Sequence, residues 1–439
     1  MKIAKLVLTS FICLFSPLCQ AQEIGLRDLL NEGLKVNYGI QLSKISESIS
    51  ENNVSRAAAG EIPKVTLQGG VSGDISSNST RSRTTGTTTT ENGTFNHGAN
   101  ASISADWTIF DGFKMQAEYA RLKELNNQGK LSTRLSVESF IADLTTEYYN
   151  FIRQKIRLKN LKYAVALSRE RLRIVEARNF VGNAARLDVQ QASVDFNADS
   201  ADCLKQKELV SSANIQINKL ISKDDVNTRI SVKDTLINPN LTLEHDVLLE
   251  SLFKNNVNLL LAESDKTLTE LELKKVKSRD YPYFKIGADY GINNNRYGSG
   301  ATFRRTDWGP EVGVTVGFNL FDGLRSRDRK NANLAIEQAE IKHKNVRLQL
   351  EADFADLWQA YQNNIKLLQL EQKNVITASN NYEIAHERFL LGDLSGIEMR
   401  EAQKGLLDAQ ERMLEAEYNT KVCEISLIEI SGNTSQYLQ

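Results

Sequence analysis

A short stretch decides the fold of this chain: Leu320-Phe321-Asp322-Gly323, which occurs a second time as Ile109-Phe110-Asp111-Gly112. Upstream of each copy, apolar and polar residues alternate as in a β-strand, and downstream lies a long run of helix-forming residues. Glycine permits a sharp backbone turn at such a junction, and aspartate can cap the helix that follows. The residues that we assign to these two strand-to-helix junctions are Phe110, Asp111, Gly112, Phe321, Asp322 and Gly323.

The duplication extends beyond this motif, which indicates an internal repeat. Pro63 recurs as Pro282, and Gly182 recurs as Gly392. The apolar and asparagine positions that recur near the start of each half are Leu30, Leu34, Asn37 and Ile40, matched by Leu249, Phe253, Asn256 and Leu259. We therefore divide the mature chain into a first repeat, residues 22–230, and a second repeat, residues 231–439. Each is expected to contain a first helix, two strands and two long helices.

The first residues, 1–21, have the features of a signal peptide: Lys2 and Lys5, an apolar run, and the small-residue cleavage site Cys19-Gln20-Ala21. Lipid attachment at Cys19 is an alternative, although Leu18 stands where a small residue is expected. The chain has 54 Lys and Arg residues against 55 Asp and Glu residues, and this balance argues against nucleic-acid binding.

Each repeat should open with a helix, which in the first repeat runs from about residue 25 to 59, and proline then ends the helical geometry. After Pro282, apolar residues alternate with glycine and charged residues from Phe284 to Ile292, and a return strand from Val312 to Leu320 does the same. This period is typical of strands in outer-membrane barrels, with apolar side chains toward lipid, whereas a soluble sandwich is the alternative. Residues 76–96 are almost all small, polar or charged, which predicts a solvated, mobile loop.

The mature chain has no apolar run of the length that a transmembrane helix needs, so a membrane span must be made of strands. Four strands cannot close a barrel alone, because the smallest single-chain barrels have about eight strands. Lipid does not tolerate open sheet edges. If the strands lie in a membrane, several protomers must share one barrel, and three protomers would supply twelve strands.

The residues after each junction change to a heptad period, for example Leu144, Tyr148 and Phe151 in the first repeat and Leu350, Phe354 and Leu357 in the second. A helix from about Lys114 to Asn179 would be roughly 100 Å long at 1.5 Å per residue, which exceeds the height of a globular core. We expect such helices to pack in antiparallel pairs that turn near glycine.

These features together resemble the TolC-type outer-membrane efflux proteins, also called outer membrane factors, over nearly the whole mature chain. The resemblance implies a mixed α/β membrane protein that assembles as a homotrimer. Its twelve-stranded β-barrel takes four strands from each protomer and is continuous with a long antiparallel coiled-coil tunnel in the periplasm. The implied location is the cell outer membrane, with a large periplasmic portion.

The resemblance also implies that a periplasmic adaptor, the membrane fusion protein, docks on the two helical turns and links the tunnel to an inner-membrane pump. The docking positions are Val181, Gly182, Asp188, Gly392 and Ser395. Glu398 and Glu401 match the carboxylates that ring the closed periplasmic aperture, where like charges would raise one another's pKa. The alternative for these two glutamates is an ordinary solvated helix face.

The expected function is a passive exit duct of a tripartite efflux system for small toxic compounds or drugs. A duct for type I protein secretion shares every motif named above. A structural or adhesive envelope protein, a coiled-coil stalk without an open lumen, is the alternative from another class. The sequence contains no arrangement of catalytic residues, no metal-ligand spacing and no phosphate-binding glycine loop, so neither enzyme activity nor a cofactor is expected.

Overall fold

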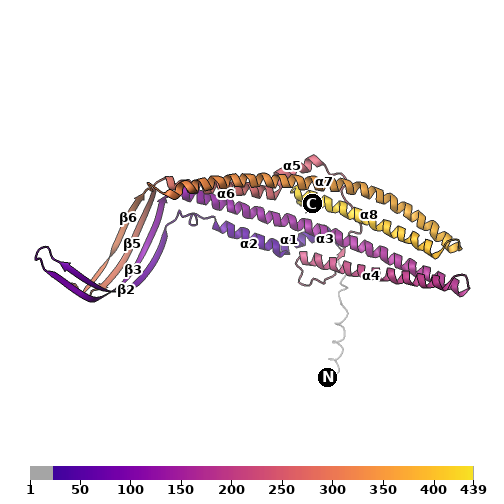
Figure 1. Cartoon of the computed structure of the whole chain (residues 1–439), viewed down its shortest axis with the longest axis horizontal. Coiled ribbons are helices and arrows are strands. Elements are labelled where there is room, and N and C mark those ends of the chain that lie inside the picture. Colours follow the sequence, from indigo (N-terminus) through magenta and orange to yellow (C-terminus); the bar gives the residue numbers. More distant parts are fainter. Residues whose placement is uncertain (1–22, 439) are drawn as a thin grey trace, which may run out of the picture. The chain divides into compact units, whose positions relative to one another are not determined.

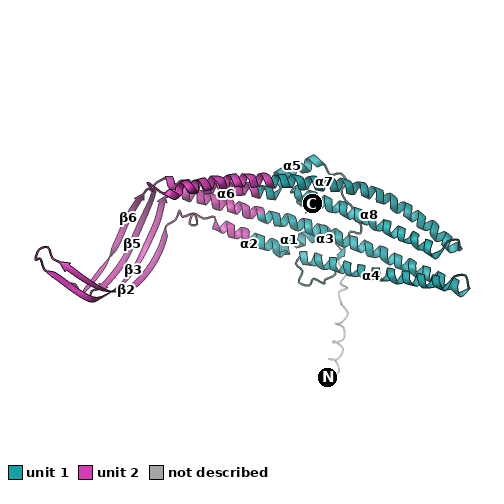
Figure 2. Ribbon diagram, viewed as in Figure 1, with its two compact units in different colours: residues 1–44, 132–260, 346–439 teal, residues 45–131, 261–345 magenta. Residues whose placement is uncertain are grey.

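The computed structural model describes residues 23–438, so the predicted signal peptide and Cys19 lie outside the described residues. Figure 1 shows long helices and a sheet of long strands. The chain divides into two compact units (Figure 2). Among the described residues, the first unit contains 23–44, 132–260 and 346–438, and the second contains 45–131 and 261–345. Each unit draws on both halves of the sequence, and the repeat boundaries proposed above remain a prediction.

The second unit holds a four-stranded antiparallel sheet in the order β2-β3-β5-β6. The strands are β2 (Lys64–Arg81), β3 (Thr88–Phe110), β5 (Tyr283–Arg296) and β6 (Arg304–Gly317). β2 and β5 begin directly after Pro63 and Pro282, so the predicted strand starts are confirmed. The helices end earlier than predicted, because α2 spans only Tyr38–Asn53 and α6 only Val257–Lys277.

Two strand predictions were wrong in detail. Residues 76–96 do not form an irregular loop, because β2 continues to Arg81 and pairs with β3, from Arg81↔Thr88 back to Ser76↔Thr94. Serine, threonine and asparagine can form these strands, because the backbone N–H and C=O groups of a hairpin bond to one another even where no hydrophobic core is present. The second return strand ends at Gly317, so Phe318 and Leu320 follow the strand and are not part of it.

Four long helices form two hairpins: α3 (Lys114–Phe180) with α4 (Arg186–Leu220), and α7 (Gly323–Leu391) with α8 (Gly396–Ile430). The predicted start at Lys114 and the predicted turns at Gly182 and Gly392 are confirmed. The shorter elements are β1 (Glu23–Ile24), α1 (Leu26–Val36), α2 (Tyr38–Asn53), β4 (Ser231–Val232), α5 (His245–Asn255), α6 (Val257–Lys277), η1 (Ser278–Asp280) and η2 (Thr434–Leu438). None of the described helices is both long and apolar enough to cross a membrane.

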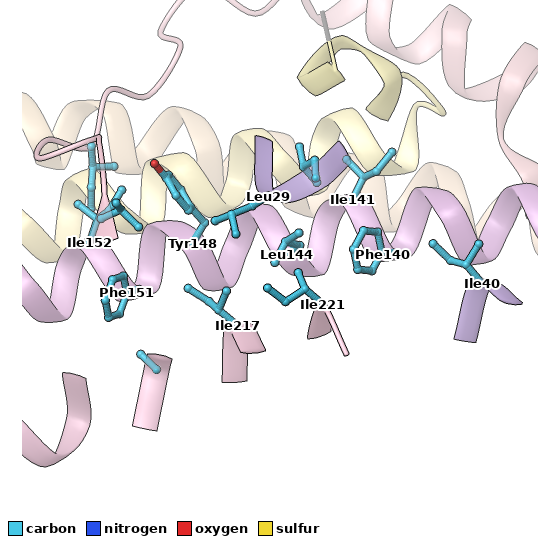
Figure 3. Packing of buried hydrophobic residues seen from close by; sticks show 14 of the residues in the cluster. Leu29, Ile40, Phe140, Ile141, Leu144, Tyr148, Phe151, Ile152, Ile217 and Ile221 are labelled. Carbon is cyan, nitrogen blue, oxygen red and sulfur yellow. The ribbon is translucent and has the colours of Figure 1, made fainter. Parts of the chain in front are cut away.

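The core of the first unit lies along the heptad stripe of α3 (Figure 3). Leu144 and Tyr148 are fully buried against α1, α4 and α8. The Tyr148 hydroxyl donates a hydrogen bond to Asp234 at 2.6 Å. In the second half, the Tyr361 hydroxyl donates to the Asn240 carbonyl, also at 2.6 Å. Burial of one such side chain contributes about 1.5–3 kcal/mol, so this stripe holds the helices together.

Recurrent asparagines break the first helix of each half, so the predicted continuous helix from residue 25 to 59 was wrong. Asn37 separates α1 from α2; its amide donates to the Leu220 carbonyl at 2.8 Å, and its side-chain oxygen accepts from the Ile40 N–H. Asn256 does the same between α5 and α6, with the Ile430 carbonyl at 2.8 Å. Each asparagine side chain therefore caps the second helix of its pair and also donates a hydrogen bond to the last backbone carbonyl of a long helix that is distant in the sequence.

Candidate functional site

The turns that join the long helices are the first candidate site. Gly182 and Gly392 have φ angles of +81° and +92°, in the left-handed region that glycine adopts without strain. In each turn the glycine N–H and the next N–H donate to carbonyls of the last helical turn; Asn183 bonds to Arg178 at 2.8 Å, and Asp393 bonds to Arg388 at 3.0 Å. This pattern is a common helix C-cap and explains why both helices end at these residues.

Each second helix begins with a side-chain cap. In α4, Asp188 accepts a hydrogen bond from the Ala185 N–H at 3.0 Å. In α8, Ser395 and Glu398 form a capping box: the Ser395 hydroxyl accepts from the Glu398 N–H, and the Glu398 carboxylate accepts from the Ser395 N–H at 3.0 Å. Two of the predicted docking residues, Asp188 and Ser395, therefore also set where the helices start.

Both turns border a cavity of about 370 Å³ within the first unit. Arg178 joins the turns, because its guanidinium donates to the Phe389 carbonyl and lies 4.7 Å from the centroid of the Phe389 ring. The large apolar side chains that the turns leave exposed are Phe180, Val181, Leu187, Leu390, Leu391 and Ile397. Of these, only Val181 was predicted from the sequence as a docking residue; the signal for the others was an apolar residue within a few positions of each turn glycine.

A buried polar network joins α3, α4 and α8 a few helical turns away from the two hairpin turns. Arg400 of α8 donates twice to Asp199 of α4, at 2.7 Å each, and Arg171 of α3 donates to Asp195 of α4 at 2.6 Å. Ser168 also donates to Asp199. Burial lowers the pKa of Arg171, whereas the hydrogen bonds to Asp199 raise the pKa of Arg400. Sequence analysis missed this network, because its members are far apart in the chain.

Glu398 and Glu401 lie in the first turns of α8, and both are exposed. The Ser395 hydroxyl and N–H donate to Glu398, and these hydrogen bonds hold the pKa of Glu398 below its ordinary value. In the predicted ring, carboxylates of neighbouring protomers would repel one another, and this repulsion would raise the pKa of Glu398 instead of lowering it. The ring therefore stays a prediction, while the single chain assigns Glu398 a definite role as a helix cap.

The two strand-to-helix junctions differ in structure although their motif is the same. Asp111 accepts from the Met115 N–H at 3.0 Å, and Asp322 accepts from the Leu324 N–H at 2.9 Å, so both aspartates bond to the oncoming helix. Gly112 has a φ of +73°, and a Cβ there would overlap the Ser278 carbonyl oxygen. Gly323 has no such constraint, because its nearest neighbouring atom would be 3.9 Å away.

The junction phenylalanines also differ. Phe110 packs against Phe113 and Phe284, with ring centroids 5.1 Å and 6.0 Å apart. Phe321 is 92% exposed in the single chain. The first junction is therefore a packed element of the second unit, whereas the second presents its aromatic ring to the surroundings.

The sheet in the second unit has one apolar and one polar face. Residues opposite one another in the register share a face, and two apolar rows run across all four strands: Val65–Ala105–Ala288–Val312 and Leu67–Ile103–Tyr290–Pro310. The rows that alternate with them are Thr66–Ser104–Asp289–Glu311 and Gln68–Ser102–Gly291–Gly309. Val312 is 73% exposed, so nothing in the described chain covers the apolar face.

Comparison with known proteins identifies what this arrangement resembles. The family model described as outer membrane efflux protein matches residues 29–222 and 248–433. The outer membrane protein TolC of Vibrio cholerae is 20% identical over 309 residues, which cover 68% of this chain and 69% of that protein. The outer-membrane channel OprN superposes with a TM-score of 0.74 at 16% identity, over 93% of this chain and 90% of its own. The CmeC outer membrane channel of Campylobacter jejuni gives 0.76 at 15% identity, over 93% and 86%.

Proposed function

Because the chain belongs to the outer membrane efflux protein family, we propose that it forms the passive exit duct of a tripartite efflux system. It is a protein of the outer membrane, and its fold is that of the channel proteins named above. The observation that carries the proposal is the sheet with an uncovered apolar face and a polar, glycine-containing opposite face. In a membrane barrel the apolar face contacts lipid and the polar face lines a water-filled lumen.

The proposed assembly is a homotrimer. β2 and β6 are the edges of the described sheet, and each lacks a second strand partner within the described chain. An open edge in lipid leaves backbone N–H and C=O groups without hydrogen bonds, which costs several kcal/mol for each group. Joining β6 of one protomer to β2 of the next would remove all open edges, and three protomers would give a barrel of twelve strands.

The residues on the lumen face of the sheet distinguish an open duct from a solid stalk. The rows of this face contain threonine, serine, glutamine, aspartate, glutamate and glycine, and in the single chain a Cβ added at Gly309 or Gly313 would meet no neighbouring atom within 4 Å. A stalk would need bulky apolar residues on this face in order to fill its interior. The small and polar residues favour an open, hydrated lumen.

The proposed partners are a periplasmic adaptor and, through it, an inner-membrane pump. We assign adaptor docking to the two turns, at Val181, Gly182, Asp188, Gly392 and Ser395. The exposed apolar side chains beside these residues support a protein interface, because exposed apolar patches of this kind mark interaction sites. The pump must supply the energy, since the duct itself carries no nucleotide-binding motif.

The proposed cargo is small toxic compounds or drugs. The alternative within the same class is type I protein secretion, which uses the same architecture. The polar lumen rows carry small and polar side chains such as serine, threonine and glycine, which would contact the cargo only loosely. Selection then lies with the pump and the adaptor.

The aperture is assigned to Glu398 and Glu401, whose carboxylates would meet on the threefold axis. Such a ring holds cations and excludes anions. Replacing Glu398 by alanine would also destroy the α8 cap, so glutamine is the better probe because it keeps a capping side chain without the charge. The matched control is Glu383→Gln with Glu387→Gln, two exposed carboxylates on α7 of the same hairpin.

The test is single-channel conductance of the mature protein in a planar bilayer. Wild type should give a small, cation-preferring current. The current should grow, and its cation preference should fall, in Glu398→Gln with Glu401→Gln but not in the control. A current that is the same in all three proteins would refute the aperture assignment, and no current from a folded oligomer would favour the structural stalk.

A further inference from the structure

A basic groove lies between α3 and α4 in the first unit, and the segment at residues 227–230 after α4 forms one side of it. Its cavity volume is about 690 Å³, within the range of roughly 300–1,000 Å³ that is usual for ligand sites. We propose that this groove binds an anionic lipid, with the acyl chain on its floor and the phosphate head at its rim. The proposal does not depend on the duct function.

The floor of the groove is mainly apolar. Its apolar side chains are Phe151 and Leu158 from α3, Val210 and Ile215 from α4, and Ile230 from the segment that follows. Ser211, Asn214 and Asn227 also line the groove, and the Asn214 amide is already hydrogen-bonded to the Thr228 carbonyl and the Ile230 N–H. Phe151 is buried in the core of the unit, and Val210 and Ile230 pack against that core, so the floor is a fixed surface. An acyl chain on this floor would lose its contact with water, and each buried CH₂ group would favour binding.

The rim is positively charged and contains no acidic residue. Lys155, Lys159 and Lys162 line one side of α3, Lys207 lies on α4, and Arg229 lies in the adjoining segment. None of the five forms an ion pair with any residue between 23 and 438. Lysines at helical spacings of three and four repel one another, which destabilises the helix.

This concentration of charge is unusual for the chain. Residues 148–169 contain six Lys or Arg residues and no Asp or Glu. Elsewhere the long helices place opposite charges three or four residues apart, as in Glu118 with Arg121 and Glu170 with Arg173. A bound anion would offset the repulsion among the rim lysines and would explain why no carboxylate was placed there.

The mainly apolar floor favours a lipid over an acidic peptide as the ligand of the groove. A peptide lying in the groove would bring backbone N–H and C=O groups onto a mainly apolar surface with few free hydrogen-bonding side chains, and unpaired polar groups there oppose binding. An acyl chain has no such groups. The spacing of the lysines, one helical turn apart, suits a phosphate head that accepts hydrogen bonds from more than one ammonium group.

The test is lipid binding to the full-length mature protein in a neutral detergent, measured by native mass spectrometry. The probe is phosphatidylglycerol, and phosphatidylcholine with the same acyl chains controls for lipid that adheres to the apolar face of the sheet. The variant is Lys155→Gln with Lys159→Gln and Lys162→Gln. The matched control removes three exposed, unpaired lysines elsewhere in the same unit, by Lys366→Gln with Lys373→Gln and Lys404→Gln.

We expect the groove variant to lose phosphatidylglycerol affinity by roughly 100-fold, since each of its three lysines contributes about 1 kcal/mol to an anionic lipid contact. The control variant and the charge-conserving Lys→Arg triple variant should both bind like wild type. Equal binding by wild type and the groove variant, or equal binding of phosphatidylcholine and phosphatidylglycerol, would overturn the proposal.

Competition separates the lipid from other anions. sn-Glycerol 3-phosphate, which has the head but no acyl chain, should not displace the lipid at equal concentration. Displacement by this compound would show a phosphate site without a lipid function. Displacement by a polyglutamate peptide at equal concentration would assign the groove to an acidic protein partner instead.

Discussion

Removal of the Asp199 carboxylate should loosen the hairpin end of the first unit. Asp199 is 5% exposed and accepts two hydrogen bonds from Arg400 and one from Ser168. The substitution Asp199→Ala leaves the Arg400 guanidinium without its main partner. The loss of one partner from a buried ion pair costs about 3–5 kcal/mol, and because the Arg400 side chain is 24% exposed we take the lower end.

The expected cost of about 3 kcal/mol corresponds to roughly a 100-fold increase in the population of the locally opened state. Amide hydrogen exchange of residues 396–410 reports this opening directly, because these residues form the first turns of α8. Alanine has a higher helix propensity than aspartate, so the substitution by itself would stabilise α4. Increased hydrogen exchange in Asp199→Ala therefore cannot be due to helix propensity.

Two further variants define the origin of the effect. Asp202→Ala removes an exposed carboxylate on the same helix, whose pair with Lys205 is solvent-exposed, and should change exchange by less than about fivefold. Asp199→Leu with Arg400→Leu removes both charges and should recover much of the protection, because an apolar pair is an adequate substitute for a buried ion pair. Equal exchange in Asp199→Ala and Asp202→Ala would refute the reasoning.

Two other predictions concern the second unit. Gly112→Ala should abolish most of the folded oligomer recovered from membranes, because it combines a left-handed φ with overlap against backbone, whereas Gly323→Ala should assemble normally; equal yields would contradict this. Glu118 accepts hydrogen bonds from Arg121 and Lys275, which lower its pKa from 4.5 to about 2. Its contribution to stability is therefore complete above pH 4.5 and is lost as the pH falls to about 2. Lys275→Met should move acid unfolding to higher pH, and an unchanged unfolding midpoint would exclude this role.

The capping role of Glu398 changes how the aperture is tested. An alanine variant would combine the loss of charge with the loss of a cap that stabilises the start of α8, so an increased current would have two explanations. The glutamine variant keeps the cap and isolates the charge. The structure therefore provides the design of the experiment, while the ring of carboxylates remains the proposal that the experiment tests.

The sequence by itself determined the features that depend on local chemistry. Alternation after Pro63 and Pro282 identified the strands, the heptad stripe through Leu144 and Tyr148 identified the long helices, and Gly182 and Gly392 identified their ends. Each of these signals is a short-range property of the backbone or a period in the apolar residues. The duplication strengthened them, because the same order of signals occurs twice.

Tertiary structure alone decided the features that require partners from distant parts of the chain. Asn37 ends a helix only because the Leu220 carbonyl is within reach of its amide. The Arg400–Asp199 pair joins residues on different hairpins, and the basic groove needs Lys207 and Arg229 beside the lysines of α3. Such contacts leave no period or motif in the sequence, since packing of helices against one another chooses the partners. Local rules therefore specified the elements, and long-range packing specified the sites.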